Sequence, residues 1–253
     1  MKTAIITGAS SGLGREYAIA IKKKRPEIKS IWLIARRGDK LLELAEEIGQ
    51  DMCFILALDL TTKEGLEEYS KTLKDLNPDV ALLINNAGFG KLAPFEEIDP
   101  EVSGDQVTLN CTALTVVTGY ALPFMKRDAE IINIASIASF APNPNMTVYC
   151  STKAYVLSFS KGLREELKRR GINVLAVCPG PMDTEFLPVA NIAPGTSKTF
   201  DTLPRTKPKR VAVKSLKVSK KKKAVYTPKL LFKFYRVLAK ILPHNLVMKF
   251  SKA

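Results

Sequence analysis

The stretch TGASSGLG, residues 7–14, decides the fold of this chain. It follows an apolar run of strand length at residues 3–7 and leads into a helical pattern over residues 13–24. Glycines at such a junction let the backbone turn tightly, and the first turn of the helix offers free N–H groups to a phosphate. The spacing is GxxxGxG rather than GxGxxG, so a tight turn without a ligand is the alternative. The position between strand and helix favours a dinucleotide-phosphate site.

Strand-like and helix-like segments alternate after this turn. Further strands are predicted at residues 30–35, 53–58, 80–84, 130–135 and 173–177, and further helices at residues 40–48, 63–76, 106–125 and 151–170. The strands are continuous apolar runs, as a parallel sheet covered by helices on both faces requires. The sequence therefore predicts an α/β fold: a single domain with a doubly wound, Rossmann-like parallel sheet.

Charge is distributed unevenly along the 253 residues. Residues 1–204 contain 23 Lys or Arg and 25 Asp or Glu, whereas residues 205–253 contain 16 Lys or Arg and no acidic residue. We therefore predict a catalytic domain over 1–204 and a basic C-terminal extension over 205–253, packed on that domain. Because the charge is confined to the extension and no basic-aromatic recognition motif accompanies it, nucleic-acid binding is not predicted.

Other classes of site and location are disfavoured by composition. The four cysteines lack CxxC spacing and the only histidine is His244, so neither a metal site nor a disulfide framework is predicted. No signal peptide is expected at the N-terminus. Residues 106–125 are uncharged and long enough to span a bilayer, but their polar side chains favour a buried or interface helix. We expect a cytoplasmic protein, with a peripheral position at a membrane left open.

Two arginines follow the second predicted strand. An acidic residue at this point accepts the ribose hydroxyls of NAD(H), whereas an arginine accommodates the 2′-phosphate of NADP(H). Arg36 and Arg37 therefore favour NADP(H), because a guanidinium can pair with a phosphate in bidentate fashion. NAD(H) stays open because Asp39 lies nearby.

Tyr149 and Lys153 form a YxxxK pair at the opening turn of a predicted helix. Residues four apart share a helix face, so the ammonium can lie near the phenol. That charge, with the positive nicotinamide ring of an oxidised cofactor, would lower the tyrosine pKa from about 10 and suit it to proton transfer. Taken alone, the pair could equally be a partly buried aromatic and a surface lysine.

With these motifs in order, the chain resembles the short-chain dehydrogenase/reductase family over about residues 1–185. The resemblance rests on the glycine turn, on NNAG at residues 85–88, on a gap of 13 residues between Ser136 and Tyr149, and on PGxxxT at residues 179–184. It implies a catalytic set of Asn110, Ser136, Tyr149 and Lys153. It also implies cofactor contacts from Gly8, Ser10, Ser11, Gly12, Leu13, Gly14, Arg36, Arg37, Asp59, Leu60, Asn86, Ala87, Gly88, Tyr149, Lys153, Pro179, Gly180 and Thr184.

The resemblance further implies a role for each catalytic residue. Tyr149 exchanges a proton with the substrate oxygen, and Ser136 hydrogen-bonds that oxygen. Lys153 binds the nicotinamide ribose and depresses the tyrosine pKa, and Asn110 holds a water that links Lys153 to solvent. A homodimer or homotetramer is also implied, with the helix around Asn110 as a frequent dimer face.

The C-terminal part departs from the short reductases of this family. Residues 185–208 are predicted to form a long irregular substrate loop, and the four lysines at 220–223 an exposed loop. A helix is predicted to start at Thr227-Pro228, with a basic stripe of Lys229, Lys233, Arg236 and Lys240 among apolar residues. Such a helix can lie on an anionic membrane through residues 228–250, or pack on the substrate pocket or a subunit partner.

These observations predict an NADP(H)-dependent oxidoreductase that interconverts a secondary alcohol and a ketone. The apolar loop and extension favour an apolar substrate such as a hydroxysteroid. A long-chain acyl or small carbonyl substrate is the alternative. A cofactor-binding regulator without turnover is the competing class, against which the intact catalytic set argues.

Overall fold

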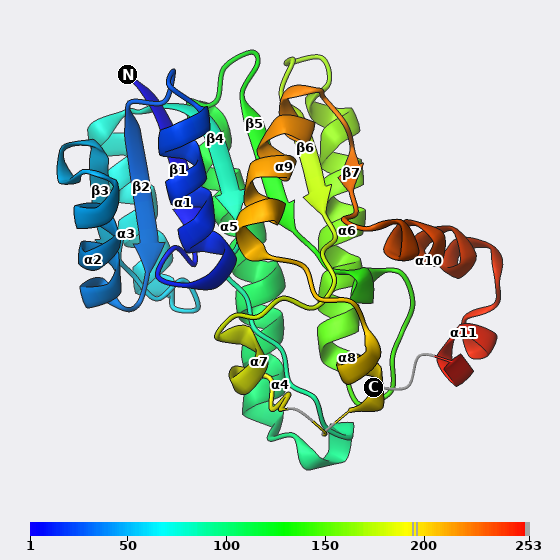
Figure 1. Cartoon of the computed structure of the whole chain (residues 1–253). Helices are drawn as coiled ribbons and strands as arrows, with labels where there is room; N and C mark the ends of the chain where they lie inside the picture. Colours follow the sequence, from blue (N-terminus) through cyan, green and yellow to red (C-terminus); the bar gives the residue numbers. More distant parts are fainter. Residues whose placement is uncertain (194, 196, 251–253) are drawn as a thin grey trace.

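Seven parallel strands form one sheet in this computed structural model, which describes residues 1–193, 195 and 197–250 (Figure 1). The strand order is β3-β2-β1-β4-β5-β6-β7. The chain winds outward from β1 in one direction and then from β4 in the other, so the predicted doubly wound sheet is confirmed. The strands are β1 Lys2–Thr7, β2 Ser30–Ala35, β3 Cys53–Ala57, β4 Asp79–Asn85, β5 Glu130–Ile134, β6 Asn173–Val177 and β7 Val225–Tyr226.

Helices cover both faces of this sheet (Figure 1). One layer contains α1 Gly12–Lys24, α2 Gly38–Ile48 and α9 Pro208–Lys220, and the other contains α3 Lys63–Leu76, α5 Leu114–Ala121 and α6 Thr147–Leu167. The remaining helices are α4 Pro100–Val107, α7 Phe186–Val189, α8 Lys198–Thr202, α10 Leu230–Ile241 and α11 His244–Phe250. Shorter turns are η1 Gln50–Met52, η2 Phe95–Glu97, η3 Thr108–Ala113, η4 Leu122–Phe124 and η5 Ile137–Ser139.

Two cores explain why the strands are apolar without alternation. In β1, Ala4 and Ile6 belong to the core under α1, α2 and α9, whereas Ile5 belongs to the core under α3, α5 and α6. In β4, Leu82 and Leu83 divide between the two cores in the same way. Successive strand residues point to opposite faces, so burial on both faces requires an apolar residue at each position.

The segment predicted as one helix over 106–125 starts earlier and is not uniform. It begins at Pro100, because the Asp99 side chain caps it by accepting a hydrogen bond from Glu101 N at 2.7 Å. It continues as α4, a π-helical turn at Thr108–Ala113, and α5. The stretch Pro100–Phe124 is long and apolar enough to cross a membrane by composition. It packs on β4, α3 and α6, in line with the expectation of a buried or interface helix.

The C-terminal extension does not start with a loose tail. Helix α9 packs against α1, and β7 joins the sheet by pairing Val225 with Ala176 and Tyr226 with Val177. The sequence patterns predict neither element. The predicted irregular loop at 185–208 contains α7 and α8, and its residues 194 and 196 lie outside the described residues, as do 251–253 of the extension.

The predicted helix start at Thr227-Pro228 is wrong. Thr227 is buried directly after β7, and a residue that precedes proline favours extended backbone. The chain turns at Lys229, whose φ is 61°, and α10 begins at Leu230. Of the exposed loop predicted at 220–223, residues 221–223 are an exposed turn, whereas Lys220 is the last residue of α9.

Candidate active site

A cavity of about 910 Å³ lies at the carboxyl ends of the parallel strands. Residues that follow β1, β2, β3, β4, β5 and β6 all contribute to its wall. The cavity therefore includes the point where the strand order reverses, between β1 and β4, which is where open α/β sheets bind ligands.

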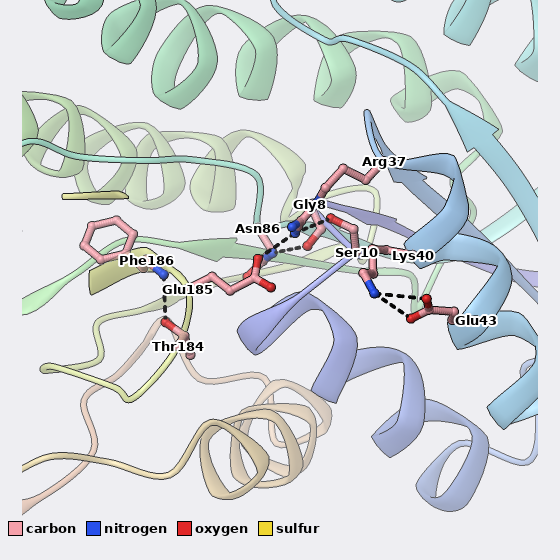
Figure 2. A network of polar contacts seen from close by, with 9 residues as sticks. All are labelled: Gly8, Ser10, Arg37, Lys40, Glu43, Asn86, Thr184, Glu185 and Phe186. Atoms are coloured by element: carbon pink, nitrogen blue, oxygen red, sulfur yellow. Dashed lines mark hydrogen bonds and ion pairs between the residues drawn. The ribbon is translucent and has the colours of Figure 1, made fainter. Parts of the chain in front are cut away.

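The glycine turn forms one end of this cavity. Gly8 and Gly12 have φ of 65° and 52°, which side chains with a Cβ rarely adopt. Asn86 fixes the turn, because its side-chain nitrogen donates to the carbonyl oxygen of Gly8 at 3.0 Å (Figure 2). Gly14 packs beneath the turn, where an added Cβ would stand 2.1 Å from the Gly8 oxygen.

The start of α1 suits an anion. Ser11 precedes the helix without a side-chain cap, and the first turn contains no acidic residue, so the first backbone N–H groups keep their positive potential. Within the chain, Glu185 is the anion at this place. Its carboxylate accepts hydrogen bonds from the Ser11 hydroxyl and from Arg37, the latter at 2.7 Å. The residues present therefore fit the phosphates of a dinucleotide.

Arg37 links Ser10 of the glycine turn to Glu185 (Figure 2). Besides Glu185, it donates to the hydroxyl of Ser10 at 3.2 Å. The hydrogen bond from Arg37 lowers the pKa of Glu185, so the carboxylate stays charged. Arg37 thus already binds an oxyanion at the edge of the glycine turn, which is the chemistry that a cofactor phosphate requires.

Arg36 and Asp59 form the neighbouring wall. The Arg36 guanidinium lies 3.7 Å from the Asp59 carboxylate and is 75% exposed. Burial would raise the pKa of Asp59, but hydrogen bonds from Thr61 and the charge of Arg36 leave it lowered. Asp59 accepts from both the backbone nitrogen and the hydroxyl of Thr61, at 2.9 and 2.7 Å. The carboxylate is thereby fixed at the cavity wall.

Tyr149, Ser136 and Lys153 meet in the middle of the cavity. Tyr149 and Lys153 come from the start of α6, and Ser136 follows β5. The Tyr149 and Ser136 hydroxyls are hydrogen-bonded to each other. The Ser136 oxygen also accepts from Ala138 N at 3.1 Å, which fixes its position at the start of η5.

Lys153 is buried, not a surface charge. Its ammonium donates to the Ile134 carbonyl oxygen at 2.9 Å and lies 5.7 Å from the centroid of the Tyr149 ring. Burial lowers the pKa of Lys153 to about 8. Burial also raises the pKa of Tyr149, and the hydrogen bond with Ser136 offsets only part of that rise. In the chain alone the tyrosine pKa is therefore raised and not lowered, because desolvation of the phenolate is the largest influence on it. The lowering by the oxidised nicotinamide stays a prediction.

Asn110 lies behind the cavity wall, in the π-helical turn. Its side-chain oxygen accepts from Phe89 N at 3.0 Å, and its nitrogen donates to the Phe89 carbonyl at 2.8 Å and to the Thr152 hydroxyl at 3.0 Å. Both polar atoms of the amide thus have a partner in the chain, and the water link from Asn110 to Lys153 stays a prediction. Gly88 lies beside both Asn110 and Lys153. A Cβ added at Gly88 would stand 2.7 Å from the asparagine oxygen and 3.4 Å from the lysine nitrogen.

The other end of the cavity is apolar. Phe186 of α7 packs on the Tyr149 ring, with centroids 5.4 Å apart. Phe232 of α10 is fully buried against Gly180, where an added Cβ would lie 2.2 Å from the phenylalanine ring. The wall also contains Leu187, Val189, Phe200, Leu203, Leu231 and Tyr235. Of the two arrangements predicted for the C-terminal helix, packing on the pocket is present.

Sequence reasoning found most of this wall. All predicted site residues line the cavity except Gly14 and Asn110, which support it from behind. It did not single out Glu185 and Phe186, which begin the predicted substrate loop, or Phe232, and all three are far in sequence from the residues they contact. The one usable signal was the position of Glu185 directly after the PGxxxT segment.

Comparisons with known proteins agree with this geometry. The family model described as short chain dehydrogenase matches residues 2–194. Serine 3-dehydrogenase of Agrobacterium fabrum (strain C58) is 34% identical over 189 residues, which cover 73% of this chain and 73% of that protein.

Two solved structures resemble almost the whole chain. A short-chain dehydrogenase from Sphingobium yanoikuyae in complex with NADPH has a TM-score of 0.79 and 30% identity, and the match covers 96% of this chain and 97% of that one. The bulky-bulky ketone specific alcohol dehydrogenase from Comamonas testosteroni has a TM-score of 0.77 and 29% identity, with 98% and 94% covered.

Proposed function

Because this chain belongs to the short-chain dehydrogenase family of NAD(P)-dependent oxidoreductases, which act on CH–OH groups, we propose that it interconverts a bulky apolar ketone and its secondary alcohol with NADP(H). One observation carries the proposal: Tyr149, Ser136 and Lys153 stand between a phosphate-binding glycine turn and an apolar chamber within the same cavity. A hydride donor and an apolar carbonyl compound can therefore meet at the tyrosine hydroxyl.

The cofactor half of the proposal rests on Arg37 and Arg36. An arginine after β2 accommodates a 2′-phosphate, and Arg37 already binds a carboxylate at the edge of the glycine turn. The NADPH complex of the Sphingobium protein supports the same preference. Asp59, Leu60, Ala87, Gly88, Pro179, Gly180 and Thr184 would complete the contacts with the dinucleotide.

The mechanism follows from the protonation states of the site. When bound, the nicotinamide supplies or accepts the hydride. The raised pKa of Tyr149 keeps its hydroxyl protonated, so it can donate that proton to a carbonyl oxygen. Ser136 donates a second hydrogen bond to the same oxygen. With a pKa of about 8, Lys153 is mostly an ammonium at neutral pH and stabilises the phenolate left after proton transfer. Asn110 positions Phe89 and Thr152 around this group.

The substrate class is proposed from the apolar chamber. The aromatic and aliphatic side chains of α7 and α10 suit two large apolar substituents, such as those of a hydroxysteroid, better than a small polar one. The ketone specificity in the name of the Comamonas protein supports this choice. The Agrobacterium relative is named for serine, so a small polar substrate is the first alternative to test, beside long-chain acyl and small carbonyl compounds.

The test is NADPH and NADH oxidation by purified protein against steroid ketones, long-chain ketones, small carbonyls and the oxidised product of serine. We expect turnover of a bulky ketone with NADPH, at least about a hundredfold lower in Tyr149→Phe because proton transfer is lost. Tyr155→Phe, an exposed tyrosine on the same helix outside the cavity, is the matched control and should keep its activity.

Arg37→Ala tests the cofactor half separately. Loss of a charge-assisted hydrogen bond should lower kcat/KM for NADPH about tenfold or more and leave that for NADH nearly unchanged. Equal losses with both cofactors would contradict the proposed preference. NADPH binding without turnover of any substrate would favour the regulator class instead.

The remaining parts of the proposal concern association. We include a homodimer or homotetramer, which light scattering would check. We also include a peripheral contact between residues 228–250 and a membrane, for which α10 provides a specific surface.

A further inference from the structure

Helix α10 has two parallel stripes on its outer side. Lys233, Arg236 and Lys240 of the helix, with Lys229 directly before it, recur at spacings of 4, 3 and 4. Each is followed by an apolar residue of the second stripe: Leu230, Phe234, Val237 and Ile241. Consecutive helical residues are 100° apart, so the basic and the apolar stripe run side by side along the helix. We call these the basic stripe and the outer apolar stripe.

The outer apolar stripe is exposed. Leu230, Phe234, Val237 and Ile241 are 80, 62, 51 and 72% exposed. The opposite side of the same helix is occupied, because Phe232 and Ala239 are buried in the protein. Four large apolar side chains in one exposed row go beyond the scattered exposure that is normal at a surface, and such a row marks an interaction site.

Charge indicates which partner fits this row. No member of the basic stripe forms an ion pair within residues 1–193, 195 and 197–250, and the extension contains no acidic residue. A second copy of this helix would bring an equally basic face against the first and be repelled. An anionic surface with an apolar interior satisfies both stripes at once.

We propose that α10 docks on an anionic lipid bilayer. The outer apolar stripe enters the boundary between headgroups and acyl chains, and the basic stripe lies among the lipid phosphates and carboxylates. Helices α10 and α11 extend beyond the β7 edge of the sheet, which lets a flat surface reach them (Figure 1).

The same helix forms a wall of the cavity. Phe232 and Tyr235 line it from the buried side, and Leu231 lines it while 52% exposed, so Leu231 marks a mouth beside the outer apolar stripe. A docked protein therefore opens this mouth near the lipid, and an apolar ketone can enter from the bilayer. The docking stands without the proposed function, whereas this substrate route rests on it.

The experiment is co-sedimentation of the full chain with vesicles of phosphatidylcholine and with vesicles in which phosphatidylserine replaces about a third of it. We expect binding to the anionic vesicles that weakens as salt is raised. Phe234→Ser with Ile241→Ser should weaken binding at least about tenfold through lost apolar burial. Lys233→Gln with Lys240→Gln should weaken it about fivefold per lysine, because each basic residue near the surface contributes about 1 kcal/mol.

Matched controls use residues elsewhere on the surface. Lys23→Gln with Lys74→Gln, and Leu42→Ser, alter exposed residues of α1, α3 and α2 and should leave vesicle binding unchanged. All variants should keep the turnover of a water-soluble ketone, since none of these residues lines the cavity.

Three outcomes would overturn the docking proposal. They are no binding of the wild type to anionic vesicles, equal binding by the stripe variants, and loss of an oligomer in the Phe234→Ser/Ile241→Ser variant by light scattering, which would identify a second copy as the occupant. If the protein binds vesicles as expected but turns over no ketone, the docking proposal is supported and only the proposed function is contradicted.

Discussion

Helices α9 and α10 are both basic and lack acidic residues, yet they present different surfaces. Every exposed residue of α9 is basic, namely Lys209, Arg210, Lys214, Lys217 and Lys220. In α10 the exposed residues include three basic and five apolar side chains, which are Lys233, Arg236 and Lys240 and Leu230, Leu231, Phe234, Val237 and Ile241. Basic residues by themselves indicate only that the outer face of a helix is exposed to solvent. The exposed apolar row beside the charge is what distinguishes α10 as an interaction surface.

The largest difference between the two helices should appear in stability. Leu216 of α9 is 2% exposed in the core under the sheet, so Leu216→Asp should cost about 4 kcal/mol or more by burying an unpaired charge. Phe234→Asp on the outer face of α10 should change the free energy of unfolding by about 0.5 kcal/mol or less. Urea denaturation followed by circular dichroism measures both, and a similar loss in the two variants would mean that Phe234 is packed.

A buried and an exposed lysine should differ in how they make the free energy of unfolding depend on pH. Lys153 has a pKa of about 8 when folded, against an ordinary value of 10.5. Between these values the unfolded chain binds the additional proton, so the free energy of unfolding rises with pH. Compared with Lys153→Met, the free energy of unfolding of the wild type should rise by up to about 3 kcal/mol between pH 8 and pH 10.5. Below pH 8 the buried lysine is charged, and the wild type is destabilised by the full cost of burying that charge.

Lys214→Met in α9 is the control for this pH dependence. Lys214 is exposed, so the variant should show the same pH slope as the wild type. Denaturation at a series of pH values would count against a buried ammonium at Lys153 if its replacement left the slope unchanged.

An energetic coupling is expected between α10 and the wall of the catalytic cavity, through Gly180 and Phe232. Gly180→Ala places a methyl group where the Phe232 ring lies, which should cost about 2 kcal/mol. In a Phe232→Ala background the same change should cost little, so a double-mutant cycle should give a coupling of about 2 kcal/mol. Additive losses would show that the ring moves away freely.

The smallest effect is expected on the outer face of α9. Lys214→Gln with Lys217→Gln should alter the free energy of unfolding by no more than about 0.5 kcal/mol, because solvated lysines without partners contribute little. Vesicle binding by this pair should fall less than by Lys233→Gln with Lys240→Gln. An equal fall would spread the lipid contact over both helices and remove the distinction between them.

The fold was predictable because each of its signals is local. Continuous apolar strands, the glycine turn and the YxxxK spacing are all visible within short windows of sequence. The site was predictable where its residues follow strand ends, which the parallel sheet brings to one edge.

The rest depends on contacts that no local window contains. Arg37 and Glu185 are 148 residues apart, and only the folded chain brings them to the same glycine turn. Residues 230–242 are mostly apolar, so their pattern could not say that Phe232 faces inward and Phe234 outward. Helix α9 was missed because its lysines made residues 208–220 resemble the rest of the basic extension.

The close approach of Gly180 and Phe232 also limits how this enzyme could have diverged. A large aromatic residue at this place and a side chain at position 180 compete for the same space, because the ring occupies the volume that a Cβ needs. A homologue with another residue at position 180 is therefore expected to have a smaller residue at position 232 or a shifted helix. Two positions in a homologue would thus reveal whether its C-terminal helix lies as α10 does here.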